Sequence, residues 1–190
     1  EHNRHNHNRV CSLKWSPNDY LLASGGNDDK LIIHDLRNNR HLHELKKHKA
    51  AVKAIDWCPN KNNIIASGGG TNDHFVHVWN VNKDSNNCSI GSVNTHNQIT
   101  SLHWAYNANH FVTTHGYSSN DIRIWNFPEF TLCKDIKGHD NRILFSSMSP
   151  NYGDIVTASP DESLKIWNLF KKYNNHTNYS LSFQHNNTIR

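Results

Sequence analysis

The sequence contains few of the residues and runs that helices and membrane spans need. Among its 190 residues are one Met and five Pro, against six Trp, seven Phe and six Tyr, a balance that favours short packed strands. No window approaches about 18 consecutive apolar residues, which argues against a membrane-spanning helix and a membrane partner. No charged-then-apolar segment near the start resembles a secretory signal. The chain begins at Glu1 rather than Met, which predicts a fragment of a longer protein.

Clustered positive charge and paired cysteines are also missing. The net charge is +4, and the densest basic patch, at 46–49, is too short for the stripe that a nucleic-acid partner needs. The four cysteines form no Cys-x-x-Cys pair and lie beside apolar runs. They predict reduced, buried thiols, and we expect the protein in the nucleus and cytoplasm.

An internal repeat organises the chain. Residues at the end of an apolar run, before a turn, recur at spacings of 42, 47 and 44: Trp15, Trp57, Trp104 and Met148. A closing position and an opening histidine keep the same step: His34, Trp79, Trp125 and Trp167, and His7, His48, His96 and His139. A period of about 40–45 residues is typical of WD repeats.

Each repeat reads as four short strands with turns between them, which is one blade of a propeller. The prediction is an all-β WD-repeat β-propeller with four blades of four-stranded antiparallel sheet. The blade cores are expected at 7–36, 48–81, 96–127 and 138–169. The polar segment 171–190 is expected to be mostly disordered, with at most one strand.

Two repeats carry the hydrogen-bonded set of WD blades, in which a buried histidine needs partners for its ring nitrogens. The members are His48, Ser67, Asp73 and Trp79 in the second unit, and His139, Thr157, Asp161 and Trp167 in the fourth. The third unit has Ser119 where the Asp is expected, and the first has His34 in place of Trp. We expect those two blades to be held less firmly.

The sequence disfavours three chemical alternatives. A His-Ser-Asp hydrolase is disfavoured because the set recurs with the structural repeat. The closest histidine pairs, such as His74 and His77, have no Cys or carboxylate at zinc spacing, so no metal site is expected. The Gly68–Thr71 run lacks the Lys-Ser/Thr ending of a phosphate loop. The sequence predicts no catalytic residue and no cofactor.

The wording of the turns resembles a particular family. The segments 48–80, 111–130 and 138–150, with motifs such as Gly-Gly-Gly-Thr-x-Asp and Thr-His-Gly-Tyr-Ser, resemble the fizzy and fizzy-related proteins, WD-repeat activators of the anaphase-promoting complex. The resemblance covers residues 10–170 and the final Ile-Arg. It implies the last four blades of a seven-bladed propeller that binds degrons, the short recognition motifs of substrates.

The resemblance also implies site residues. Those matching the receptor for the Lys-Glu-Asn degron are Asn27, Asp29, Thr71, Gln98 and Arg142. Glu162 matches the acidic residue that receives the arginine of a destruction-box degron, and Ile189 and Arg190 match the tail that docks on the ligase.

The function implied is a non-enzymatic substrate-recognition and activator subunit of that ubiquitin ligase. Its expected partners are subunits of the anaphase-promoting complex, degron-bearing cell-cycle proteins, and checkpoint or inhibitor proteins. A generic WD-repeat scaffold in another complex is the alternative, followed by a propeller hydrolase.

Overall fold

The computed structural model describes residues 5, 7–172 and 179–189, with side chains through Phe170 and at Thr188. Every regular element among them is a β-strand, and none is a helix that could cross a membrane. The first sheet holds β1 (Val10–Trp15), β2 (Leu21–Gly26), β3 (Leu31–Asp35) and β4 (Arg40–Leu45), and the second β5 (Val52–Trp57), β6 (Ile64–Gly69), β7 (Phe75–Asn80) and β8 (Ser89–Asn94). The third holds β9 (Ile99–Trp104), β10 (His110–His115), β11 (Asp121–Asn126) and β12 (Leu132–Lys137), and the fourth β13 (Phe145–Met148), β14 (Asp154–Ser159), β15 (Ser163–Lys172) and β16 (Tyr179–Ile189).

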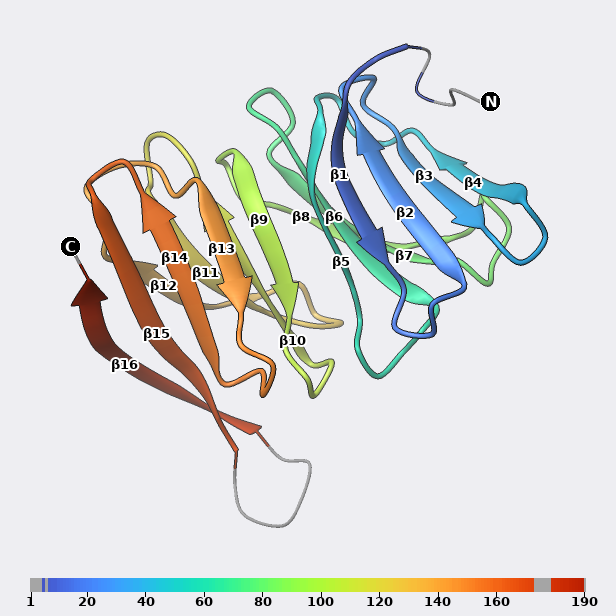
Figure 1. Cartoon of the computed structure of the whole chain (residues 1–190). Coiled ribbons are helices and arrows are strands. Elements are labelled where there is room, and N and C mark those ends of the chain that lie inside the picture. Colours follow the sequence, from blue (N-terminus) through green and yellow to red (C-terminus); the bar gives the residue numbers. More distant parts are fainter. Residues whose placement is uncertain (1–4, 6, 173–178, 190) are drawn as a thin grey trace.

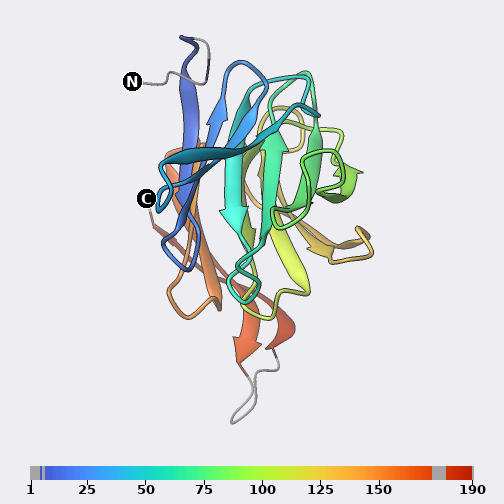
Figure 2. The same ribbon diagram turned by 90° about the vertical axis from the view of Figure 1, so that its right-hand side faces the viewer.

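Each sheet is antiparallel with its strands in chain order, and the four sheets follow one another as a fan (Figure 1). The first strands of neighbouring sheets lie side by side, β1 next to β5 and β5 next to β9. Turned by 90°, the sheets are seen stacked one behind another (Figure 2). The predicted fold class, four WD-repeat propeller blades, is confirmed.

The hydrophobic core lies between the sheets. One cluster joins the first and second sheets, a second joins the second and third, and a third joins the third and fourth. Each middle sheet is therefore covered on both faces, and this is why every residue of a strand such as Ile64–Gly69 is buried, with Ser67 as its one polar side chain.

The recurring tryptophans of the inner strands connect one blade to the next. The indole Nε1–H of Trp57 donates to the carbonyl oxygen of Lys14, 3.0 Å away, and that of Trp104 donates to the carbonyl oxygen of Asp56 at 3.2 Å. The Asp56 carboxylate also accepts the backbone N–H of Trp104. Burial of each indole is thus coupled to a satisfied N–H donor, as a buried Trp requires.

The two end sheets each leave an apolar face without a neighbouring sheet. Leu13 of β1 is 62% exposed, whereas Ile55 and Leu102 at the same place in the middle sheets are buried. Phe145 of β13 is 72% exposed. Exposed apolar surface of this kind is typical of interaction surfaces.

The structure corrects three expectations. The one strand allowed for in the tail is present as β16, residues 179–189, which pairs with β15 and is longer than a mostly disordered tail implies. The opening histidine of the first blade is His5, not His7, so that blade starts before residue 7. Of the four free cysteines, Cys58 and Cys88 are buried, but Cys11 and Cys133 are only half-buried.

Candidate functional site: the loop surface at one end of the blades

The predicted degron residues all lie at the same end of the fan. Because the strands alternate in direction, the turns between second and third strands meet the connections from each sheet to the next at one end. We call these seven connections the loop surface; they are residues 27–30, 46–51, 70–74, 95–98, 116–120, 138–144 and 160–162. The sequence-based assignment thus places its candidates on one surface.

The hydrogen-bonded sets fasten these loops to the sheets. In the second blade His48 Nδ1 bonds to the Asp73 carboxylate, and its Nε2 lies 2.7 Å from Ser67 Oγ, which also accepts from the Trp79 indole at 2.9 Å. This predicted set is confirmed. Because the histidine belongs to one loop and the aspartate to the next, the set fixes the two loops relative to each other.

The predicted set of the fourth blade is also confirmed. His139 lies 2.8 Å from both the Asp161 carboxylate and Thr157 Oγ1, and the Trp167 indole donates to the same hydroxyl at 2.8 Å. Hydrogen bonds from Ser163 and His139 lower the pKa of Asp161 well below its usual range, in spite of the opposing effect of burial, so the carboxyl stays ionised.

The first blade has a substitute set rather than a missing one. His5 bonds to Asp28 at 2.8 Å and to Ser24 at 2.9 Å, and His34 Nε2 lies 3.2 Å from the Ser24 hydroxyl, where the other blades have a tryptophan. His7, expected to open this blade, is exposed and has a left-handed backbone, with φ of 63°.

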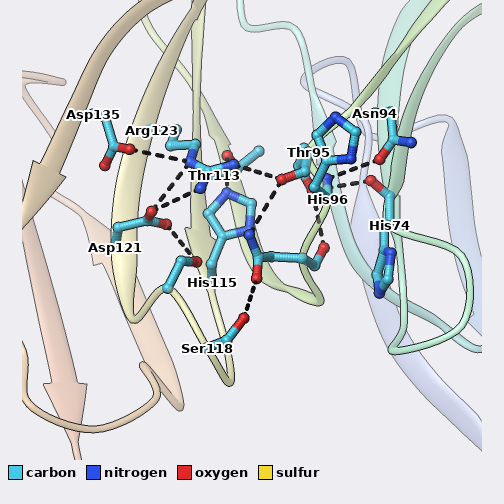
Figure 3. Close-up of polar contacts among 12 residues, drawn as sticks. His74, Asn94, Thr95, His96, Thr113, His115, Ser118, Asp121, Arg123 and Asp135 are labelled. Atoms are coloured by element: carbon cyan, nitrogen blue, oxygen red, sulfur yellow. Dashed lines mark hydrogen bonds and ion pairs between the residues drawn. The ribbon is translucent and has the colours of Figure 1, made fainter.

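The third blade uses different residues (Figure 3). His96, expected to open it, is exposed with φ of 58°, and Thr95 takes the buried place. Arg123 donates to the Thr95 carbonyl oxygen and to the Asp121 carboxylate, with Nη2 2.9 Å from Oδ2. An arginine–aspartate pair therefore fastens the loop that a histidine fastens in the other blades. These contacts do not indicate that the third blade is held less firmly than the others.

A second histidine completes that blade. His115 Nε2 lies 2.8 Å from Thr113 Oγ1, which accepts from the Trp125 indole at 2.8 Å. His115 is fully buried, and burial lowers the pKa of its imidazole to about 3, so the ring is neutral. The predicted substitute, Ser119, instead donates to Asp121 at 3.0 Å.

Two of the predicted degron residues are connected through the third blade. The Gly116 backbone N–H donates to the Gln98 carbonyl oxygen at 3.1 Å, and the next residue, Tyr117, lies under the Arg142 guanidinium, 4.9 Å from carbon to ring centroid. Tyr117 is 66% exposed. We call Gln98, Tyr117 and Arg142 the arginine shelf.

The other candidates lie in separate turns. Asn27 and Asp29 are in the β2–β3 turn, exposed Thr71 is in the β6–β7 turn, and exposed Glu162 is in the β14–β15 turn. Asp29 and Glu162 share a left-handed backbone, with φ of 63° and 62°. His74 and Asn120 hold the same place in the other two sheets, so this conformation belongs to the blade and is not special to the predicted site.

Two points remain: the predicted docking tail, and a site residue that the sequence candidates lacked. Ile189 ends β16, and Arg190 lies outside the described residues, so the predicted tail site stays a prediction. Tyr117 was not among the sequence candidates although the Thr-His-Gly-Tyr-Ser motif contains it. The signal that could have identified Tyr117 as a site residue is an aromatic side chain at the tip of a loop.

Comparisons with known families and proteins agree with this geometry. The WD40 domain of anaphase-promoting complex subunit 4 matches residues 2–60, and the WD domain, G-beta repeat, matches 87–126 and 130–168. The WD repeat-containing protein srw1 of Schizosaccharomyces pombe is 39% identical over 95% of this chain and 32% of its own length. FIZZY-RELATED 3 of Arabidopsis thaliana is 42% identical over 85% of this chain and 33% of its own length.

The chain belongs to the fizzy and fizzy-related family of WD-repeat proteins. A further relative is the anaphase-promoting complex subunit cdh1 of Dictyostelium discoideum, 36% identical over 87% of this chain and 26% of that protein. A chain in a crystal structure of the mitotic checkpoint complex superposes with a TM-score of 0.80 at 38% identity, covering 85% of this chain and 50% of that one. This fizzy-family chain spans about a third of the length of srw1 and FIZZY-RELATED 3.

Proposed function

We propose that this chain is part of a substrate-recognition and activator subunit of the anaphase-promoting complex ubiquitin ligase. Three relatives or matched families carry the fizzy-related or anaphase-promoting-complex name, and the superposed structure is an assembly of the mitotic checkpoint. The loop surface supplies the means of recognition.

The arginine shelf is the observation that carries the proposal. Arg142 forms no ion pair within the described part of the chain, and its half-buried side chain keeps Nε without a hydrogen-bond partner there. A cation held over an exposed aromatic ring and left without a carboxylate is suited to an acidic side chain of a bound peptide. The Gln98 side chain and the exposed amide of Asn27 suit the polar residues of a Lys-Glu-Asn degron.

We propose that the protein performs no bond chemistry. The hydroxyls that a hydrolase reading would need, those of Ser67 and Thr157, are 0% and 1% exposed and already accept a hydrogen bond from an indole. A substrate carbonyl has no access to either oxygen. The activator instead raises the concentration of degron substrates near the ligase.

The wider assignment follows from the family. The four blades would form the C-terminal part of a seven-bladed propeller, with Glu162 receiving the arginine of a destruction box. Ile189 and Arg190 would dock on a subunit of the ligase, and checkpoint or inhibitor proteins would compete for the loop surface. Such a protein would act in the nucleus and cytoplasm.

A peptide-binding titration tests the receptor assignment. We expect Arg142→Ala in the full-length protein to weaken binding of a fluorescent Lys-Glu-Asn peptide about 10- to 100-fold, since a lost charged hydrogen bond costs about 1.5–3 kcal/mol. The matched control is Arg37→Ala, an exposed arginine that also stacks on a tyrosine but lies in the β3–β4 turn at the opposite end. Equal affinity of the two variants would remove the arginine shelf from the proposal.

A further inference from the structure

A buried cluster of metal-ligating side chains lies where two loops of the loop surface meet β7 of the second blade. His48, Asp73 and His77 each offer one ligand atom, and these atoms all lie within 4.8 Å of one another. The three residues are 5%, 6% and 7% exposed. We propose that they form a binding site for a divalent transition-metal ion of the Zn²⁺ type.

His77 is the residue that points to a ligand. Both of its ring nitrogens are buried, and neither has a hydrogen-bond partner within the described residues. The His77 ring is stacked on the Phe75 ring and packs at a tilt against Trp79. It makes an edge-to-face contact with the His48 ring, and the two ring centroids are 4.7 Å apart. Burying a polar group without a hydrogen-bond partner destabilises a fold, so an imidazole in this place calls for a partner that the described residues do not supply.

The other blades show what this position does when no metal is involved. Two residues before the closing tryptophan, the third blade has Arg123 and the fourth has Lys165. Arg123 donates to the Thr95 carbonyl oxygen and Lys165 to the Gly138 carbonyl oxygen, each in the loop that enters the blade. His77 makes no such bond. It is directed at the histidine–aspartate pair instead of the backbone.

The donor set fits a borderline cation. Two imidazoles and one carboxylate are the ligands of many zinc sites that keep a fourth position open. Burial lowers the pKa of His77 to about 4, which leaves a neutral ring with a free lone pair near pH 7. With one carboxylate and two neutral imidazoles, the occupied site carries a charge of about +1.

Binding requires a small rearrangement. Ligand atoms around tetrahedral zinc lie about 3–3.5 Å apart, given bonds of about 2.0–2.2 Å, so the His77 ring would move about 1.5 Å toward the pair. The proton on His48 Nδ1 would move to Nε2 and be donated to Ser67 Oγ, 2.7 Å away. No net proton is released: Ser67 Oγ then accepts from both His48 and the Trp79 indole, and its own hydroxyl hydrogen turns away from His48.

Within the part of the chain that the structure describes, such a cluster is found in one blade only. The fourth blade has the same histidine–aspartate pair in His139 and Asp161, but Lys165 places an ammonium group where the third ligand would be. The fourth blade is therefore a natural control within the chain. The variant His77→Lys copies its arrangement and leaves His48, Ser67, Asp73 and Trp79 in place.

The test is a titration of the metal-free full-length protein with Zn²⁺ by calorimetry and with Co²⁺ by visible absorption. We expect one metal ion to bind per chain at the buried site. Bound Co²⁺ should give the intense visible bands of a low-coordinate ion, and Zn²⁺ should raise the Tm of the protein. His77→Lys should lose the bands and the rise and weaken binding at least about 100-fold, while the exposed-site control His96→Lys keeps all three.

Two results would overturn the proposal. One is the absence of a saturable buried equivalent in the unaltered protein, with only the weak binding that exposed histidines give. The other is a His77→Lys variant that binds Zn²⁺ as the unaltered protein does. If His77→Lys fails to fold, His77→Leu, which matches the apolar Ile32 of the first blade, serves in its place with the same expected loss.

Discussion

The third and fourth blades fasten the same loop in different ways. In the fourth, His139 at the start of the blade bonds to Asp161 and Thr157. In the third, the equivalent histidine has turned out into solvent, and Arg123 reaches from the third strand to Asp121 and to the loop backbone. In both blades the partner of the basic side chain is a carboxylate, Asp161 in the fourth and Asp121 in the third.

The difference arises from a shift of one residue. The opening histidine lies nine residues before the end of the inner strand in the second and fourth units, but His96 lies only eight residues before Trp104. The residue nine before is Thr95, which is buried and accepts the bond from Arg123. What a blade needs is a donor that joins loop and sheet. The residue type that supplies it is free to change.

The comparison predicts that removing the Asp121 carboxylate lowers the free energy of unfolding more than removing the Asp161 carboxylate does. Asp121→Ala should lower the free energy of unfolding by about 3–5 kcal/mol, because Arg123 cannot lose its charge and is left mostly buried. Asp161→Ala should cost less, about 1–3 kcal/mol, because an imidazole, unlike a guanidinium, has a neutral form. Urea unfolding measures both.

A matched control and a contrary outcome accompany that prediction. His96→Ala, at an exposed position, should change the free energy of unfolding by no more than about 0.5 kcal/mol. Asp135 lies 3.7 Å from Arg123 and would compensate in part. If Asp161→Ala proves the more costly of the two, the arginine pair does not fasten the third blade in the way described.

The second prediction concerns acid and is smaller. The pKa of His115 is lowered to about 3 in the folded protein against an ordinary 6.5, so its stabilising effect is complete above about pH 6.5 and is lost as the pH falls toward 3. Near pH 5 one such histidine contributes a slope of about 1.4 kcal/mol per pH unit. His77 acts in the same sense in the second blade, down to about pH 4.

The measurement is unfolding free energy between pH 4.5 and 6 for the unaltered protein and His115→Gln. The variant should lose about 1.4 kcal/mol per pH unit of slope, whatever its overall stability. An unchanged slope would mean that His115 does not stay neutral in the fold. The fourth blade has Ser159 at the position of His115, so this position of the fourth blade contributes nothing to the slope.

Much of the fold could be predicted because its signals are local. The tryptophan spacing and the turn residues determine the blades, and the histidine–aspartate sets of the second and fourth units follow from the repeat. The first blade could not be read correctly in this way. A turn closed by the Asn8 N–H on the His5 carbonyl oxygen buries His5 and leaves His7 outside, although both fit the period.

The remaining misses depend on contacts between distant segments. The length of β16 depends on pairing along β15, of which the weak apolar alternation of its polar sequence indicates only a part. The arginine shelf depends on Tyr117 lying under Arg142, 25 residues further along the chain. The same holds for His77, whose partners His48 and Asp73 come together only when the sheet forms.

The most direct test of the central claim is a ubiquitin-transfer assay with the anaphase-promoting complex and a substrate bearing a Lys-Glu-Asn degron. The full-length protein should stimulate chain formation on that substrate, Arg142→Ala should reduce the stimulation about tenfold or more, and Arg37→Ala should leave it unchanged. Stimulation that is absent with the unaltered protein, or identical for the two arginine variants, would contradict the account.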